Sequence, residues 1–374
     1  MQMAEAMNIT AAITLYHDET PEDLADFVEY MYGASSSIWG AKRVSDGHAK
    51  KYSTDKYFEI GNEIDTPNWG EKAAAMEAAA VKHGVGKKLR YAAPMQVGAH
   101  TNQKGWAGGK VGAQGYLDIH DGNGLFPAGQ IEAYLRDFQA GGGYDTRFAI
   151  WETNTAQLHD FHRALMEAGD LASLDRDAPR LRIDSRTASF CSEKSGHVDL
   201  WEKGHGDQGL VFFTQNVTWL QPPAWVHSMV AKTWQPNQLN STASSPLLDV
   251  TAASADGSVA LSVRVTNTGN IDVTATVAIS GKHLGEVTVV TLVAPGGNTS
   301  AVNPWQDTKY IAALFTACHV SPHNSRPQTD TCRHRLDLYR YIVPSAPKTV
   351  AWSKGSTFVF AAQSYTTLAF SSLK

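Results

Sequence analysis

The chain has 374 residues, of which 43% are hydrophobic and 18% charged, and its formal net charge is −5. This length and composition predict a globular protein with a sizeable core, in one large domain or two smaller ones. The charge gives no indication of a nucleic-acid partner, and no apolar run approaches the length of a membrane span, so we predict neither kind of partner. The first residues show no signal-peptide pattern.

The three cysteines, Cys191, Cys318 and Cys332, are too few for a disulfide scaffold or a Cys-rich zinc site. The second and third could pair, which would leave Cys191 as a buried thiol. Asn-x-Ser/Thr sequons favour a secretory lineage. They begin at Asn8, Asn216, Asn240 and Asn298.

Strand and helix patterns alternate up to about residue 245. Thr20 and Pro21 predict the start of the first helix, as an N-cap followed by proline at the first helical position, and this helix ends near Gly33. The segment that follows, with Trp39 and Arg43, is predicted to be a loop. The strands are predicted at residues 9–16, 57–60, 89–97, 116–120, 146–151, 186–190 and 211–213, and the helices at 21–33, 71–83, 130–138, 158–171 and 225–230.

This alternation predicts a parallel, wound α/β domain, and the polar residues at its strand ends are typical of the C-terminal rim of a (β/α)8-type barrel. The sequence contains about six βα units, whereas a closed barrel needs eight, so we expect the barrel to be incomplete. We assign residues 1–245 to a catalytic (β/α) barrel that lacks its first units.

After about Pro246 the pattern changes to strands separated by Gly, Asn and Asp turns, with no helix between them. This pattern predicts an antiparallel β-sandwich over residues 246–374. A His- and Arg-rich segment at about 305–341 does not fit a sheet, and we treat it as an atypical insertion. The strands are predicted at residues 247–252, 259–265, 273–279, 286–293, 348–352, 356–361 and 366–370.

The central motif is Tyr57–Glu63, in which a strand runs into a glycine and then into Asn62 and Glu63. A second strand leads directly into Glu152, 89 positions later (152 minus 63), with Trp151 just before it. Two strand-end glutamates in an α/β pattern are what a two-carboxylate glycosidase needs. Asn62 could bind the sugar 2-hydroxyl without adding a charge that competes with the acid.

Other interpretations of these residues remain open. A single glutamate at a strand end is most often a solvated rim residue or an ion-pair partner, and this holds for Glu63 and Glu152 alike. His120 lies at a strand end, where a substrate contact and a core histidine are both possible. His159 and His162 are three positions apart on a predicted helix, but no third ligand has suitable spacing, so we predict no metal site.

The chain resembles the α-L-arabinofuranosidases of glycoside hydrolase family 51 over roughly three quarters of its length. The Gly-Asn-Glu motif is shared by many retaining barrel glycosidases, so the surrounding residues and the trailing sandwich point to this family. The segments that carry the resemblance are Phe27–Tyr30, Trp39–Gly40, Arg43, Gly47–His48, Tyr57–Glu63, Arg186–Trp201, Phe212–Trp234 and Ala361–Leu368.

The resemblance implies that Glu63 is the general acid/base, that Asn62 contacts the 2-hydroxyl, and that Glu152 is the nucleophile. We expect Trp69 and Trp151 to line the cleft between them. We also expect the two carboxyl groups to lie on one face, and burial to raise the pKa of Glu63 so that it holds a proton.

The sequence departs from the family pattern in two respects. An aromatic residue most often follows the nucleophile in this family, whereas here Thr153 follows it. Family members have two further βα units and a sandwich strand before the point that matches Met1, so we expect an N-terminally truncated product or an incomplete gene model. The 305–341 segment could have a similar origin, such as a translated intron.

The leading hypothesis is a retaining glycosidase that releases α-L-arabinofuranosyl units from arabinoxylan, arabinan or related glycans, without a metal or organic cofactor. The alternatives are another retaining barrel glycosidase that acts on β-linked glycans, and a catalytically dead carbohydrate-binding remnant. An extracellular location is implied by the resemblance.

Overall fold

The computed structural model describes residues 1–8, 10–54, 56–62, 64, 66, 68–94, 115–118, 147–151, 160–181, 183–186, 210–213, 218–255, 260–280, 285–300, 303, 342, 344–353 and 355–371. The chain divides into two compact units that alternate along the sequence. Unit 1 comprises residues 1–122, 126–153 and 180–187, and unit 2 comprises residues 123–125, 154–179 and 188–374. The sequence predicts a single boundary at 245/246 instead, and its assignment of a catalytic barrel and a sandwich to the two sides stays a prediction.

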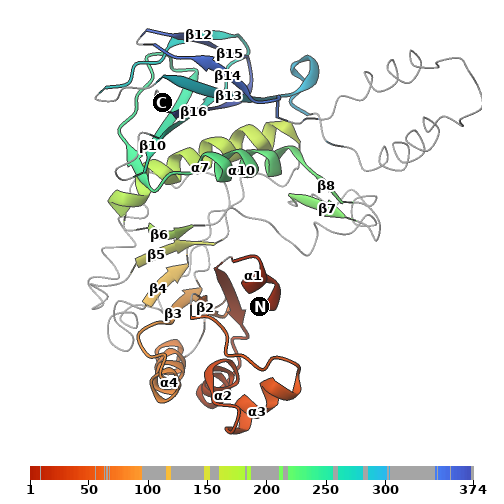
Figure 1. Ribbon diagram of the computed structural model, residues 1–374, viewed down its shortest axis with the longest axis vertical. Helices are drawn as coiled ribbons and strands as arrows, with labels where there is room; N and C mark the ends of the chain where they lie inside the picture. The colour runs from red at the N-terminus through yellow and green to blue at the C-terminus, as the bar shows by residue number, and fades with distance from the viewer. Residues whose placement is uncertain are drawn as a thin grey trace, which may run out of the picture. The chain divides into compact units, whose positions relative to one another are not determined.

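Unit 1 is built on a six-stranded sheet in which neighbours along the chain are neighbours in the sheet, in the order β1-β2-β3-β4-β5-β6 (Figure 1). All five pairings are parallel. The strands are β1 (Ala11–Leu15), β2 (Lys56–Ile60), β3 (Arg90–Pro94), β4 (Gly115–Asp118), β5 (Arg147–Ile150) and β6 (Ile183–Arg186). The predicted parallel α/β arrangement is therefore confirmed, but no closed barrel is formed by the residues that the structure describes.

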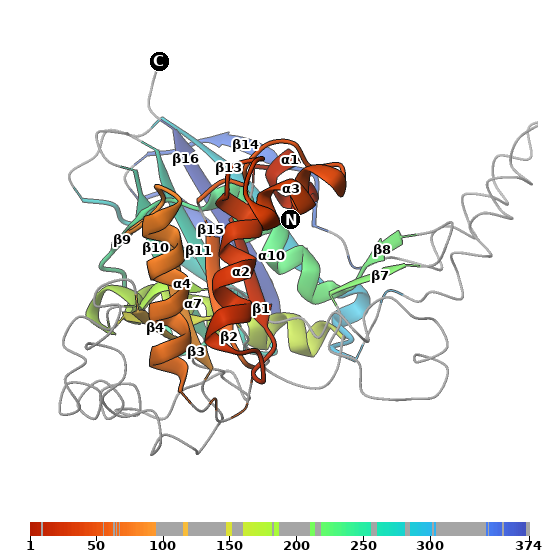
Figure 2. The same cartoon turned by 90° about the horizontal axis from the view of Figure 1, so that it is seen from below.

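Helices α2 (Pro21–Tyr32) and α4 (Trp69–Lys82) lie side by side in unit 1 (Figure 2). Phe58 of β2 is fully buried on the helix side of the sheet, edge-on to Phe27 of α2 with ring centroids 6.2 Å apart. Tyr91 of β3 lies beside Phe58, and its hydroxyl donates to Glu77 of α4. Alternate strand residues therefore face the helices, as expected for a wound α/β sheet.

The start of α2 confirms the predicted cap. The Thr20 hydroxyl accepts the backbone N–H of Asp23, and the Asp23 carboxylate accepts the backbone N–H of Thr20. This reciprocal capping box satisfies two of the amides that have no partner inside the helix.

The predicted loop after α2 is wrong, because residues Ile38–Ser45 form helix α3. Arg43 of this helix is 1% exposed, yet its guanidinium donates to the backbone carbonyls of Tyr30, Gly33 and His48. These carbonyls replace the water that a buried cation loses. The helix is thus fixed by contacts with the segments on either side of it, 5 to 13 positions from Arg43, which helix propensity does not reveal.

A short helix, α1 (Gln2–Ala6), was not predicted and reaches the N-terminal end of β2. The Glu5 carboxylate accepts hydrogen bonds from the buried Lys56 ammonium, at 3.0 Å, and from the backbone N–H of Ser53. Burial alone would raise the pKa of Glu5, but these donors outweigh it, so the pKa lies below its usual value.

Unit 2 contains the predicted antiparallel sheets. One sheet has the order β14-β13-β16-β11-β10-β9, and β12 pairs with β15. Among the described strands of these two sheets, β9, which is three residues long, is the one that was not predicted. The strands are β9 (Asn237–Leu239), β10 (Leu248–Ser254), β11 (Leu261–Asn267), β12 (Val273–Thr276), β13 (Glu286–Val293), β14 (Lys348–Ala351), β15 (Thr357–Phe360) and β16 (Ser364–Ser371). Their apolar residues, including Val287, Trp352, Phe360 and Leu368, form a common core.

Unit 2 also includes α7 (Phe161–Leu181) up to residue 179, the hairpin of β7 (Val211–Phe213) and β8 (Thr218–Leu220), and α10 (Pro222–Thr233). The helices were predicted as part of the barrel region. A second core instead joins them to the sandwich, through residues such as Phe161, Val226, Leu292 and Tyr365.

The predicted insertion at about 305–341 lies outside the described residues except at its borders. The Asn303 side chain donates to the carbonyl of Ile342 and accepts its backbone N–H at 2.9 Å. Gln221 binds the backbone of Asn303 in turn. The described residues that flank the predicted insertion, Asn303 and Ile342, are thus direct neighbours in unit 2.

Two neighbouring residues of α7 make ion pairs with the sandwich in different environments. The Asp175–Arg264 pair is buried, with side chains 5% and 4% exposed, whereas the Arg176–Asp249 pair is exposed to 38% and 31%. Asp175→Ala leaves Arg264 buried without this carboxylate and is expected to lower the free energy of unfolding by about 3–5 kcal/mol. Arg176→Ala should cost at most about 1 kcal/mol.

Denaturant titration of the two variants checks this prediction. Equal losses of stability in the two alanine variants would contradict it.

Candidate active site

The C-terminal ends of β1 to β5 meet at one edge of the unit 1 sheet, because all these strands are parallel and in register. Glu59 of β2 pairs with Thr14 of β1 and with Ala92 of β3, and Asp118 of β4 pairs with Ala149 of β5. The Gly61 N–H donates to the Leu15 carbonyl at 2.9 Å, which extends the β1–β2 pairing beyond β2 itself. The residues that follow β2 and β5 therefore leave the sheet at the same edge.

Gly61 makes the turn that leads from β2 into Asn62. Its φ of 93° lies in the left-handed region, which glycine adopts without strain. A Cβ at this position would lie 2.3 Å from the Thr66 hydroxyl oxygen, and that hydroxyl donates to the Ile60 carbonyl. The glycine of the Gly-Asn-Glu motif is thus required by both conformation and space.

The sheet face opposite to Phe58 and Tyr91 carries an aromatic cluster. Tyr57 of β2 is edge-on to Tyr116 of β4 and to Trp151, each with ring centroids 5.2 Å apart. The Arg90 guanidinium lies 4.9 Å from the centre of the Tyr57 ring. Such a face can hold the apolar side of a sugar ring and provide hydrogen bonds at its rim.

Two buried acids that we did not select from the sequence lie on the same face of the sheet as this aromatic cluster, which we call the inner face. Glu59 is 3% exposed and accepts the Thr14 hydroxyl at 2.8 Å. Asp118 is fully buried and accepts the backbone N–H of Trp151 at 2.9 Å. An acid in the middle of a predicted buried strand is the signal that could have identified both, since charges are buried only with partners.

The structure describes only some of the predicted site residues. Glu63, Glu152 and His120 lie outside the described residues, so their roles stay predictions. Asn62 is exposed directly after Gly61, and Trp151 is half-buried in the aromatic cluster.

For Trp69 the prediction of a sugar contact needs correction. The side chain is 2% exposed, and its indole N–H donates to the Ala92 carbonyl at 2.9 Å. Trp69 therefore packs the start of α4 against β3, and it has almost no surface left for a sugar.

A search for metal ligands and membrane spans covers only the described part of the chain. There, no group of three or more His, Cys, Asp or Glu side chains is arranged to hold a metal ion. No helix among the described residues is long and apolar enough to cross a membrane.

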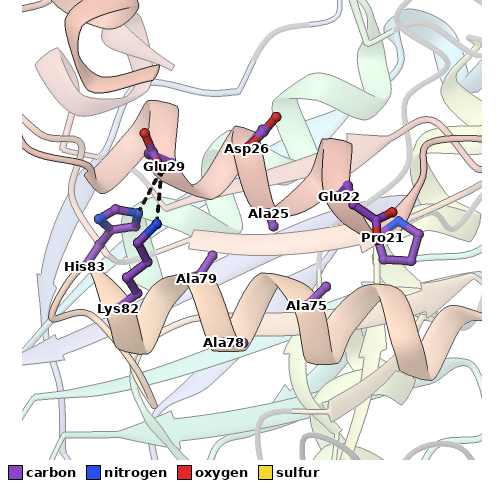
Figure 3. Close-up of a pocket in the computed structure, with 10 residues that line it drawn as sticks. All are labelled: Pro21, Glu22, Ala25, Asp26, Glu29, Ala75, Ala78, Ala79, Lys82 and His83. Carbon is purple, nitrogen blue, oxygen red and sulfur yellow. Dashed lines mark ion pairs between the residues drawn. The ribbon is translucent and has the colours of Figure 1, made fainter. Parts of the chain in front are cut away.

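A surface groove of about 380 Å³ lies between α2 and α4, and none of the predicted site residues lines it (Figure 3). Its floor consists of alanines, including Ala25 and Ala79, and at one end Glu29 pairs with Lys82 and His83. Burial alone would raise the pKa of Glu29, but the Trp39 backbone N–H and the nearby cations outweigh it, so the pKa lies below its usual value.

No protein-family model and no curated protein matches the chain. Solved structures do match it. An arabinose-bound family 51 α-L-arabinofuranosidase matches with a TM-score of 0.66 and 14% identity, over 100% of this chain and 56% of that one. The α-L-arabinofuranosidase of Thermotoga maritima matches with a TM-score of 0.68 and 13% identity, over 98% of this chain and 77% of that one. The family 51 enzyme of Xanthomonas axonopodis pv. citri matches with a TM-score of 0.64 and 16% identity, over 99% of this chain and 77% of that one.

The chain has the fold of the family 51 α-L-arabinofuranosidases. The resemblance that the sequence suggests is thus confirmed at the level of the fold. A family 30 endoxylanase from Clostridium papyrosolvens and a β-xylosidase from Caulobacter crescentus also match, with TM-scores of 0.51 and 0.54. The chain spans 56% of the length of the first of these structures and 72–77% of the others named here.

The turn at Gly61 leads to a prediction with an internal control. Gly84, after α4, also has a positive φ, of 76°, but a Cβ there would meet nothing within 4 Å. Gly84→Ala should therefore cost only the left-handed strain of about 1–2 kcal/mol. Gly61→Ala should cost several kcal/mol, roughly 3 or more, because the Thr66 contact must also be relieved.

Thermal unfolding of the two variants measures the difference. Similar midpoints for Gly61→Ala and Gly84→Ala would contradict a steric role for Thr66.

Proposed function

We propose that this chain is a retaining glycoside hydrolase that releases α-L-arabinofuranosyl units from arabinose-containing polysaccharides such as arabinoxylan and arabinan. One observation carries the proposal. In the sequence, Glu63 comes three positions after the end of β2 (63 minus 60) and Glu152 two positions after the end of β5 (152 minus 150). Both strands belong to one parallel sheet, in a fold that is similar to that of family 51 enzymes. Parallel strands deliver such residues to one edge, where a pair of carboxylates can act on one glycosidic bond.

In the proposed mechanism Glu152 attacks the anomeric carbon while Glu63 protonates the leaving glycosidic oxygen. The leaving alcohol departs, and a covalent glycosyl-enzyme forms on the Glu152 carboxylate. Glu63, now ionised, takes a proton from water, which displaces the sugar from Glu152 and regenerates both residues. No metal or organic cofactor takes part in these steps.

Two of the described residues support the proposed substrate site. Asn62 is exposed beside the predicted acid and offers an amide for the 2-hydroxyl. Trp151 belongs to the inner aromatic cluster, where it can contact a sugar. His120 remains a proposed contact. An extracellular location is part of the proposal and is supported by the sequons.

A second candidate is a retaining glycosidase specific for β-linked pyranosides, which the endoxylanase and β-xylosidase matches favour. These enzymes share the same arrangement of sheet and β-domain in the matched region. Substrate preference therefore decides between the candidates, whereas fold does not.

The test compares the wild type with Glu63→Ala, Glu152→Ala and the exposed α4 variant Glu71→Ala, on 4-nitrophenyl α-L-arabinofuranoside and 4-nitrophenyl β-D-xylopyranoside. We expect the wild type to cleave the arabinofuranoside and Glu71→Ala to match it. Glu152→Ala should lose nearly all activity. Glu63→Ala should lose about 10²–10⁴-fold in kcat/KM on leaving groups that need protonation, and much less in kcat/KM on a 2,4-dinitrophenyl arabinofuranoside, because kcat/KM reports the step in which the leaving group departs.

Release from the xylopyranoside alone would favour the second candidate. A wild type that hydrolyses neither glycoside but binds arabinoxylan would indicate the carbohydrate-binding remnant.

A further inference from the structure

Asp118 occupies an unusual position for a carboxyl group. It is the last residue of β4, it is fully buried, and its side chain lies on the face that Ala92, Tyr116 and Ala149 line. Burying a carboxyl group in such surroundings is costly unless hydrogen bonds compensate for the lost water. One compensating bond is clear, because Oδ1 accepts the backbone N–H of Trp151 at 2.9 Å.

This hydrogen bond joins the last described residue of β4 to the residue that follows β5. The β4–β5 register ends with Asp118 opposite Ala149, and β5 itself ends at Ile150. The Trp151 amide follows the last pair of the described register, and the Asp118 carboxyl group accepts its hydrogen bond. The Asp118 carboxyl group supplies the acceptor and fixes the chain one residue further.

The Trp151 side chain is held as well. Its ring is edge-on to Tyr57, with centroids 5.2 Å apart and planes at 76°. Backbone and indole are thus fixed from two different strands, β4 and β2. The residue that follows in the sequence is Glu152.

We propose that Asp118 is a positioning residue for the site: by holding the Trp151 amide, it sets the direction in which the chain enters Glu152. The inference rests on the proposed function, since it assigns Glu152 as the nucleophile. A nucleophile displaced by about 1 Å can lose on the order of 10²-fold in rate, because attack requires a narrow range of distance and angle. Asp118 does not touch the substrate in this account.

The substitutions Asp118→Asn and Asp118→Ala separate this role from simple stabilisation. The amide keeps an oxygen at the position of Oδ1 and can still accept the Trp151 N–H, whereas alanine cannot. The matched control is Asp160→Ala. Asp160 is also a buried aspartate that accepts a backbone N–H at 2.9 Å, from Arg163, but it belongs to unit 2.

The experiment measures kcat and KM on 4-nitrophenyl α-L-arabinofuranoside below the unfolding temperature of every variant. We expect Asp118→Ala to lose about 10–100-fold in kcat with a much smaller change in KM. Asp118→Asn should recover most of the loss, and Asp160→Ala should change stability but neither constant. Hydrogen exchange of the Trp151 amide should be faster in Asp118→Ala and close to wild type in Asp118→Asn.

The possible failures are distinguishable. An active wild type with Asp118→Ala unchanged in kcat, or with Asp118→Asn as impaired as Asp118→Ala, would overturn the positioning role alone. Unchanged exchange of the Trp151 amide in Asp118→Ala would overturn the hydrogen bond on which the role depends. A wild type inactive on every glycoside would overturn the proposed function, and this inference with it.

Discussion

The parallel, in-register pairing of β1 to β5 is the constraint on which the proposed site depends. Each strand contributes only a few residues to the proposed site. Residues from several strands must therefore be brought together by the sheet before the site can form. Pairing places Gly61 beside the end of β1 and Asp118 opposite β5, so that the segments leading to Asn62 and Trp151 leave one edge of the sheet. A one-residue slip would turn every second side chain to the helix side and dismantle the inner face.

Buried polar side chains that bind backbone atoms stabilise this arrangement where regular pairing ends. Arg43 donates hydrogen bonds to carbonyls at the end of α2, and Lys72 of α4 donates to the His17 carbonyl after β1. The Asp118 carboxyl group accepts a hydrogen bond from the Trp151 amide. Each bond satisfies a backbone group at or just beyond the described end of a helix or strand. Side-chain hydrogen bonds therefore fix the described ends of these elements.

Local sequence predicted the elements whose signals are local. The α2 cap was visible in Thr20 and Pro21, and β13 was predicted with its observed bounds from the alternation over residues 286–293. Helix α3 was missed because it depends on the burial of Arg43 among carbonyls of the flanking segments, which helix propensity does not show. The structure has strand β6 at 183–186, and the strand predicted at 186–190 lies outside the described residues except for Arg186. Trp69 was taken for a sugar contact because a sequence does not show which way an aromatic ring points. Asp118 was missed although an acid inside a predicted buried strand is a signal that the sequence contains.

The central claim is that one parallel sheet delivers Glu63 and Glu152 as a retaining pair. A crystal structure of the wild-type chain with a bound arabinofuranoside tests it most directly, through the distance between the two carboxyl groups. The account predicts about 5–5.5 Å, with both groups in one cleft beside Asn62 and Trp151. Carboxyl groups on opposite faces of the sheet, or more than about twice that distance apart, would contradict it.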